Sequence, residues 1–378
     1  MKTRVLLFIN SLFLVSCGID SDNQEKSSYF DFELQIDTVQ VDSRNEIIMT
    51  GANMANPAVS FDKTKFYNFD NENYLLEVFD IENYRLDQKV NFQKEGPNGL
   101  GSNQLWSLKI FPNGNIGIED FESFKIFDLQ GNQLKNVNFN EDWIKGDLTA
   151  SESFEFASVN KDGSLIAGMH FGTDNFKPLM FLLDVEDKNA KRILLPEFDK
   201  LKRYKIVFRR NGGYLTDHHE RVQFGFKGDS IIISNTAYND LYIYNEKTHE
   251  LEYRTFDHRL IPEGKEKEYK NSSESREEVV EIIYSISEEV RFTEFFWDKD
   301  NRRFYRFTNQ TIYDDKRENS TYKVSMLVYD EYLHLIGEIE LMKFNDYADP
   351  LFVKDGKVHF HLNMEDELGF IRIGLKNQ

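Results

Sequence analysis

A pair of hairpins recurs along this chain of 378 residues. In residues 105–139, "LWSLKIFPNGNIGIEDFESFKIFDLQGNQLKNVNF", alternating runs are separated by turns at Asn113-Gly114 and Gln130-Gly131. Asn-Gly and similar pairs between alternating runs are the strongest short-range signal for a β-hairpin. The stretch therefore predicts four antiparallel strands in about 35 residues, which is the content of one propeller blade.

Five further units show the same pattern. They end at Phe92, Leu195, Phe256, Leu341 and Leu375. In the first five of the six units, an apolar strand runs into Asp or Asn, at Asp80, Asp128, Asp184, Asn245 and Asp330. A plain β-meander would explain one such unit, whereas six units in register favour an all-β fold, a six-bladed β-propeller.

The sixth unit has no fourth strand of its own. The segment 29–41, "YFDFELQIDTVQV", is a strand without a unit. We expect it to pair into the last blade and close the ring, which removes the free sheet edges that template aggregation. Residues 29–378 are therefore expected to form a single domain. A content of 40% hydrophobic residues, with 33 Phe and 18 Tyr, is enough for its core.

The amino terminus has the layout of an export signal over residues 1–16. Lys2 and Arg4 precede an apolar run, "VLLFINSLFLV", which is shorter than the roughly 20 residues of a membrane span. Cys17 follows directly and is the chain's only cysteine, so an internal disulfide is excluded. Residues 17–28 are polar and acidic, and they predict a flexible tether.

The residues Leu14-Val15-Ser16-Cys17 resemble the bacterial lipobox. The resemblance implies cleavage before Cys17, acylation of its sulfur with palmitate-type chains, and anchoring in the outer membrane. An ordinary signal peptide with a chance cysteine is the alternative. The acidic residues after Cys17 resemble a surface-export signal of some Gram-negative lipoproteins, but a generic linker explains them equally well. The periplasmic or surface face therefore stays open.

Charge narrows the set of partners. The chain carries 46 basic and 65 acidic residues, a net charge of −19, and loss of residues 1–16 would remove two more positive charges. Nucleic acid is excluded because its phosphates require a basic surface. Anionic lipid would repel the body, so contact with the lipid bilayer depends on the acylated Cys17.

The unit at residues 105–139 resembles the NHL type of propeller repeat. The connection "KEGPNGLGSNQLWSLKIFPNG" resembles the Gly-Pro-rich interblade loops of six-bladed β-propeller lipoproteins. The whole chain is similar to a family of such lipoproteins whose function is unassigned. The resemblance implies a fold and a location, and no activity.

Residues near 263–291 predict a helical insertion. Val279, Ile282, Ile283, Ile286 and Val290 have helical spacing, and Ser273 or Ser275 is a candidate cap. We expect an amphipathic helix that lies across the propeller face. A helix that binds a partner is the alternative.

A basic stretch over residues 198–224 stands out in an acidic protein. It contains Lys200, Lys202, Arg203, Lys205, Arg209, Arg210 and Arg221, with a tight turn expected at Gly212-Gly213. Arginine forks suit carboxylate, sulfate or phosphate groups. We therefore expect an anionic glycan, peptide or protein to bind at Arg209, Arg210, His218 and Arg221. Neutralisation of neighbouring acids is the alternative.

Neither a metal nor a cofactor is expected. His218 and His219 are adjacent on a predicted strand, so their side chains point to opposite faces, and His359 and His361 have no acidic neighbour. The serine-hydrolase elbow, the zinc-protease motif and the P-loop are absent from the sequence. A binding or scaffolding module is therefore favoured over the alternative, a propeller-fold hydrolase or lyase that acts on a glycan.

Overall fold

The computed structural model describes residues 32–49, 57–101, 105, 107–120, 122–146, 152–159, 165–172, 178–341, 349–364 and 367–376. Cys17 and the predicted signal peptide and tether lie outside these ranges. Within them the protein is all-β, as expected. Its helices there are α1 (Asp142–Lys145), α2 (Arg276–Ser287) and the 3-10 helix η1 (Pro196–Tyr204). No helix in the described ranges has the length and apolar content that a membrane crossing requires.

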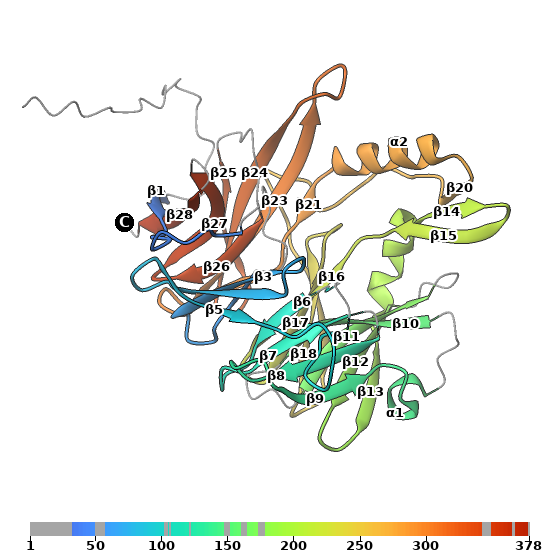
Figure 1. Cartoon of the computed structure of the whole chain (residues 1–378). Helices are drawn as coiled ribbons and strands as arrows, with labels where there is room; N and C mark the ends of the chain where they lie inside the picture. The colour runs from blue at the N-terminus through green and yellow to red at the C-terminus, as the bar shows by residue number, and fades with distance from the viewer. Residues whose placement is uncertain are drawn as a thin grey trace, which may run out of the picture.

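Six antiparallel sheets follow one another along the chain (Figure 1). Sheet 1 contains β2 (Pro57–Val59), β3 (Lys65–Asp70), β4 (Leu75–Asp80) and β5 (Arg85–Asn91). Sheet 2 contains β6 (Ser107–Ile110), β7 (Ile116–Glu119), β8 (Ser123–Phe127) and β9 (Gln133–Asn138). Sheet 3 contains β10 (Glu152–Val159), β11 (Leu165–Gly172), β12 (Leu179–Asp184) and β13 (Asn189–Leu194).

The second half of the chain repeats this order. Sheet 4 contains β16 (Val222–Lys227), β17 (Ser230–Asn235), β18 (Asp240–Asn245) and β19 (Leu251–Thr255). Sheet 5 contains β21 (Arg291–Phe292), β22 (Phe296–Asp298), β23 (Arg303–Tyr313), β24 (Ser320–Asp330) and β25 (Leu335–Glu340). Sheet 6 contains β26 (Pro350–Lys354), β27 (Lys357–Met364), β28 (Glu367–Lys376) and β1 (Glu33–Gln40).

Strand β1 confirms the pairing expected for the amino-terminal segment. It runs antiparallel to β28 in unbroken register, from Glu33 opposite Lys376 to Gln40 opposite Gly369. The first described strand is therefore the outer strand of the last sheet, and both ends of the described chain meet there.

Apolar clusters join each sheet to the next, because both faces of the sheets carry apolar residues. Strand β11 shows how the alternation works: Ile166 packs in the cluster shared with sheet 2, whereas Ala167 and Met169 pack in the cluster shared with sheet 4. Further clusters join sheets 1 and 2, sheets 4 and 5, and sheets 5 and 6. The core of the body therefore lies between its sheets.

A sixth cluster joins the last sheet to the first. The ring of Phe66 on β3 lies 5.7 Å from that of Phe352 on β26 and 5.6 Å from that of Phe370 on β28. His359 on β27 stacks on Phe352 at 4.4 Å, and its Nε2 lies 3.0 Å from the hydroxyl of Tyr84. Burial lowers the pKa of His359 to about 4.

The recurring Asp and Asn residues cap the turn before the last strand of each of the first five sheets. Oδ1 of Asp128 accepts hydrogen bonds from the backbone N–H of Gln130 at 2.9 Å and of Asn132 at 2.8 Å. The equivalent bonds form at Asp80, Asp184, Asn245 and Asp330. The carboxylate or amide oxygen thus replaces a backbone acceptor in each turn. This local chemistry is the reason that the sequence repeat is visible.

The predicted helical insertion is shorter than expected. Helix α2 begins at Arg276, and Ser275 caps it, because its Oγ accepts a hydrogen bond from the N–H of Glu278 at 3.2 Å. The expected start near residue 263 was wrong. Residues 263–275 contain the short strand β20 (Ser272–Ser273) and otherwise irregular backbone, and the side-chain amide of Asn271 donates to the carbonyls of Lys202 and Lys205.

Candidate functional site

Two insertions between the sheets combine into one separate layer, which we call the accessory layer. The first insertion lies between β13 and β16 and contains β14 (Ile206–Arg210) and β15 (Gly213–His218). The second lies between β19 and β21 and contains β20 (Ser272–Ser273) and α2. Strand β14 pairs antiparallel with β15 and parallel with β20, so segments more than 60 residues apart share one sheet. Figure 1 shows this hairpin and helix projecting from the six sheets.

The accessory layer has its own small apolar core. Ile206 on β14 packs against Val279 and Ile286 on α2, and Tyr269 and Ile283 lie against them. The apolar stripe of the helix therefore faces the accessory sheet and not the body directly.

Helix α2 also contacts the long β23–β24 hairpin of sheet 5. The rings of Tyr284 and Tyr313 meet edge-on at 5.2 Å, and Ser287 Oγ lies 3.0 Å from the hydroxyl of Tyr313. Arg317 forms an ion pair with Glu281. The layer is therefore supported from two sides.

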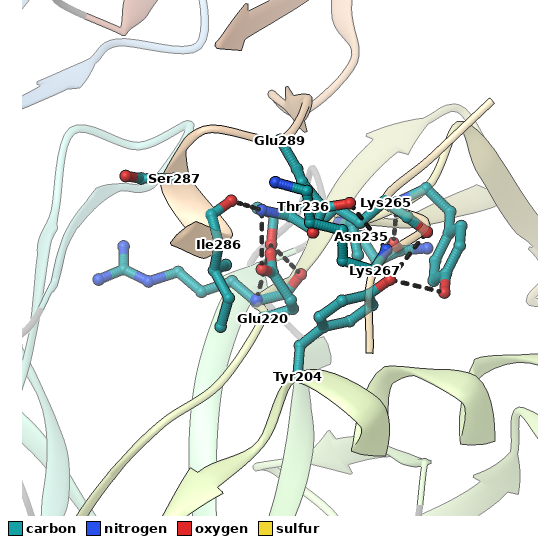
Figure 2. Close-up of polar contacts among 12 residues, drawn as sticks. Tyr204, Glu220, Asn235, Thr236, Lys265, Lys267, Ile286, Ser287 and Glu289 are labelled. Carbon is teal, nitrogen blue, oxygen red and sulfur yellow. Dashed lines mark hydrogen bonds and ion pairs between the residues drawn. The ribbon is translucent and has the colours of Figure 1, made fainter. Parts of the chain in front are cut away.

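A buried ion pair lies at the root of the accessory layer (Figure 2). Nζ of Lys265 is 3.2 Å from Oε1 of Glu220, and it also donates to the carbonyl of Ile286 at 2.8 Å. The two side chains are only 2% and 6% exposed. Burial lowers the pKa of Lys265, although the carboxylate of Glu220 opposes that shift. Glu220 also accepts a hydrogen bond from the hydroxyl of Thr236, which follows β17 in the body.

Glu289 holds the irregular segment 266–269 of the second insertion in place. Its Oε2 accepts hydrogen bonds from the N–H groups of Glu266 at 2.7 Å and Lys267 at 3.0 Å, and Oε1 accepts one from the hydroxyl of Tyr269 at 2.8 Å. The hydroxyl of Tyr204 donates to the carbonyl of Lys265 at 2.8 Å. Burial raises the pKa of the Tyr204 hydroxyl. This network is suited to positioning the layer.

Four of the predicted basic residues are neutralised by acids. Lys200 pairs with Asp240, Lys202 with Asp199, Arg203 with Glu268 at 3.3 Å, and Lys205 with Asp217 at 3.4 Å. For these four, the alternative interpretation of the basic stretch holds. The pairs of Lys200 and Arg203 join the first insertion to β18 and to the second insertion, whereas the other two pairs lie within the first insertion.

The predicted anion-binding residues lie along one hairpin and its exit. Arg209 and Arg210 are consecutive on β14, so their side chains leave the strand on opposite faces. Arg209 is partly exposed and Arg210 is exposed. His218 pairs with Ile206 at the other end of the hairpin, and among the described residues its buried Nε2 has no hydrogen-bond partner. Arg221 is exposed just after the hairpin. The structure therefore does not gather the four side chains at one point.

The hairpin turn differs by one residue from the expectation. Asn211 and Gly212 form the two-residue loop, with φ of 52° and 77°, while Gly213 already pairs with Arg210 as part of β15. Both loop positions need left-handed backbone, which Asn and Gly adopt most readily. One further irregularity is a bulge, because Phe208 faces Thr216 whereas Arg209 faces Tyr214.

The histidines do not form a metal centre. His219 Nδ1 lies 3.2 Å from Asp217 Oδ1, and this carboxylate is shared with Lys205. In the described ranges, no group of three or more His, Cys, Asp or Glu side chains is placed to hold a metal ion.

A groove of about 530 Å³ lies beside the start of the second insertion. Its walls come from β19, from the residues that follow it and from the β24–β25 turn, and they include Arg254, Phe256, Arg259, His334 and Glu338. The carboxylate of Glu338 already accepts hydrogen bonds from the N–H groups of Arg259 and Leu260. The walls mix both charges with apolar surface.

Sequence reasoning missed the residues that anchor the layer. Lys265, Glu289 and Tyr204 resemble many other lysines, acids and tyrosines of the chain, and no spacing marks them. Glu220 was noted only as a neighbour of the His pair. Their role depends on contacts between two distant insertions, which only the fold reveals.

Two solved structures share this fold at low sequence identity. A DUF4221 family member from Bacteroides vulgatus is 16% identical, with a TM-score of 0.62, over 92% of this chain and 99% of that one. An inferred exported protein from Bacteroides fragilis is 11% identical, with a TM-score of 0.55, over 91% of this chain and 96% of that one. A β-propeller domain from Myceliophteria thermophila aligns at 10% identity and a TM-score of 0.39, over 88% of this chain and 99% of that one. No curated protein matches the sequence. Residues 29–340 match a family described as a domain of unknown function, DUF4221.

Proposed function

We propose a binding role for this chain, which belongs to the DUF4221 family, a domain of unknown function. The protein is a lipoprotein of the bacterial outer membrane that carries the accessory layer on a six-bladed β-propeller. The layer binds an anionic glycan, peptide or protein.

The apolar clusters support the closed six-bladed ring. Each of the six sheets shares one cluster with the sheet before it and another with the sheet after it, and sheet 6 shares its second cluster with sheet 1. Strand β1 completes sheet 6 as the fourth strand of the order β1-β28-β27-β26. In such a ring no sheet has an uncovered face.

Strand direction then assigns the two faces of the ring. Successive strands of each sheet are antiparallel, so the end of an outer strand and the start of the next inner strand lie on one face. Both insertions leave after an outer strand, β13 or β19, and return before an inner one, so they share that face. Strand β1 is also an outer strand, and its start at Glu33 lies on the opposite face. The tether therefore attaches on the face away from the accessory layer.

The anchor follows from the lipobox resemblance at Cys17. Acylated at this residue and joined to the body on the opposite face, the protein presents its accessory layer away from the bilayer. Replacement Cys17→Ala is expected to release the protein from the membrane fraction and to abolish incorporation of labelled palmitate. Retention of the variant in the membrane, with no acyl mass on the wild type, would refute the anchor.

The accessory layer itself carries the proposal of binding. The body has its own continuous apolar contacts, yet two insertions add a layer with a separate core and a buried ion pair. Buried ion pairs contribute little net stability, because desolvation offsets the attraction between the charges. We therefore infer that the ion pair serves to position the surface of the accessory layer more than to stabilise the fold. On that surface the exposed Arg210 and Arg221 and the partly exposed Arg209 are the proposed anion-binding groups, whereas the Nε2 of His218 is buried.

An array of acidic glycans and peptides tests this role directly. The chain from Ser28 onward is screened, and ligands are remeasured with Arg209→Lys and Arg210→Lys combined. Because lysine lacks the arginine fork, we expect at least a tenfold loss of affinity. Arg203→Lys, at an arginine already paired with Glu268, is the matched control. Unchanged binding by the double variant would remove the site, and conversion of any ligand would support the hydrolase or lyase alternative.

A further inference from the structure

We propose that the axis of the six-bladed ring is a second binding site, which takes a small molecule that carries one ammonium and one carboxylate group, such as a free amino acid. The site is separate from the accessory layer, and the inference rests only on the closed ring of the proposed function.

The inner strands of four successive sheets lie next to one another. Strand β22 of sheet 5 contacts β26 of sheet 6, β26 contacts β2 of sheet 1, and β2 contacts β6 of sheet 2. Each of these strands is at the inner edge of its sheet, so the row borders the axis of the ring. Side chains that leave the row toward the axis therefore meet side chains from the far side of the ring.

Charged side chains from distant sheets meet at this axis. Glu294 lies between β21 and β22 of sheet 5, Lys109 lies on β6 of sheet 2, and Lys63 lies in the β2–β3 turn of sheet 1. The ammonium groups of both lysines stabilise the carboxylate of Glu294 electrostatically. Because sheets 6 and 1 lie between sheets 5 and 2 in the row, this approach requires the row to curve around a common axis.

None of these three charged groups has a close partner. In the described part of the chain, the carboxylate of Glu294 and the Nζ atoms of Lys63 and Lys109 form neither an ion pair nor a hydrogen bond. Glu294 is exposed and both lysines are partly exposed, so solvent-accessible space lies between the charges. Protein nevertheless surrounds this space, because burial raises the pKa of Glu294 and lowers the pKa of Lys63.

The other acids near the axis already have partners. Asp349 also acts on Glu294, but its Oδ1 and Oδ2 accept hydrogen bonds from the guanidinium of Arg291 at 2.9 Å and 3.1 Å. Asp62 acts on Lys63, but its Oδ1 accepts hydrogen bonds from hydroxyl and backbone N–H groups of its own turn. Neither carboxylate is therefore paired with a lysine of the axis.

The arrangement selects a ligand that carries both charges. A charge that protein surrounds and that lacks a partner is unfavourable, because water solvates it poorly. A ligand carboxylate between Lys63 and Lys109, with a ligand ammonium against Glu294, would supply a partner to all three groups. A purely anionic ligand would be repelled by Glu294, and a purely cationic one would be repelled by the lysines. The site therefore favours a small dipolar molecule.

Thermal unfolding of the full chain, purified in detergent, tests the inference with each common free amino acid in turn. We expect at least one of them to raise Tm, because a ligand that binds only the folded state stabilises it. For that amino acid, calorimetry compares two analogues, the amine without the carboxylate and the acid without the ammonium group. Each analogue should bind at least about tenfold more weakly than the amino acid.

Two variants assign the charges of the ligand to the protein. Lys109→Gln should weaken binding of the amino acid at least about tenfold and leave the affinity of the amine analogue unchanged. Glu294→Gln should weaken the amino acid similarly and leave the affinity of the acid analogue unchanged. Lys188→Gln, at a lysine paired with Glu141 in the β12–β13 turn, is the matched control. Because neither Lys109 nor Glu294 has a close partner to lose, both variants should keep the ligand-free Tm of the wild type.

The outcomes separate this inference from the binding role of the accessory layer. If no amino acid raises Tm, the axial site is refuted, while acidic ligands of the array still test the accessory layer. Equal affinities of the amino acid and its acid analogue, or undiminished binding by Glu294→Gln, would also refute the axial site. Failure of every acidic probe on the array would refute the proposed anionic ligand and leave the axial site intact.

Discussion

Different kinds of interaction stabilise the six-sheet body and the accessory layer. In the body, each junction between sheets is an apolar cluster, and the same kind of junction recurs from sheet to sheet. In the layer, a small apolar core is joined to the body through the ion pair of Lys265 and Glu220, whose carboxylate also binds Thr236. The body therefore distributes its stability over many equivalent contacts. The layer depends on a few individual ones, so single substitutions should separate the two regions.

Removal of β1 should have the largest effect, and it should act on the whole body. Deleting residues up to Val41 removes the whole pairing of β1 with β28 and the buried Val41 side chain. We expect a loss of more than about 5 kcal/mol and a fall in Tm of more than about 7 °C. Thermal unfolding followed by circular dichroism measures this. Deletion of residues 1–31 alone is the control, and a small, local change after the longer deletion would contradict closure by β1.

Glu220→Ala should destabilise the layer while leaving the body folded. The variant leaves the ammonium of Lys265 buried without its carboxylate, which costs about 3–5 kcal/mol. Hydrogen exchange should accelerate in β14, β20 and α2. The double variant Glu220→Leu with Lys265→Met should recover most of the protection, because no buried charge remains. Equal acceleration in β2–β5 would show that the two regions are not separable.

Acid should weaken the junction between sheets 6 and 1 through His359. Its pKa of about 4 in the folded protein lies below the 6.5 of an ordinary histidine. At pH values between 4 and 6.5, His359 binds a proton in the unfolded chain but stays neutral in the folded protein. The free energy of unfolding therefore falls as the pH falls. At pH 4.5 the wild type should lose about 2 to 3 kcal/mol more than His359→Gln, relative to pH 7.

Urea unfolding at the two pH values measures this difference. His334→Gln, at a histidine whose side chain is 71% exposed, is the matched control. An identical pH dependence for wild type and His359→Gln would show that the histidine is not buried at this junction.

The smallest effect should come from the cap of α2. Ser275→Ala removes the acceptor of the N–H of Glu278 and should cost about 1 kcal/mol. Exchange should rise in the first turn of α2 only. An effect on sheets 1 to 3 would contradict the separation of the two regions.

The sequence predicted the body much better than the layer, and the reason is physical. Turn chemistry is local: Asp128 and Gly131 act on backbone groups within four residues, so the repeat is visible in the sequence. Pairing of β14 with β20 joins Val207 to Ser272, and no local signal encodes a contact over that separation.

The candidate site shows the same limit. Composition drew attention to Arg209 and Arg210, but their opposite directions follow only from the strand assignment. Nothing in the residues around Lys265 distinguishes it from the other lysines of the second insertion. Residues that act through distant partners are therefore the ones that sequence reasoning misses.

Hydrogen exchange of the full chain, with and without the tightest-binding acidic ligand of the array at saturation, tests the central claim most directly. The account predicts added protection over residues 206–218, in β14 and β15, and none in the turns on the opposite face, such as residues 128–132 and 246–250. Protection at those turns, protection confined to the groove at residues 252–259 and 333–338, or an unchanged pattern would contradict it.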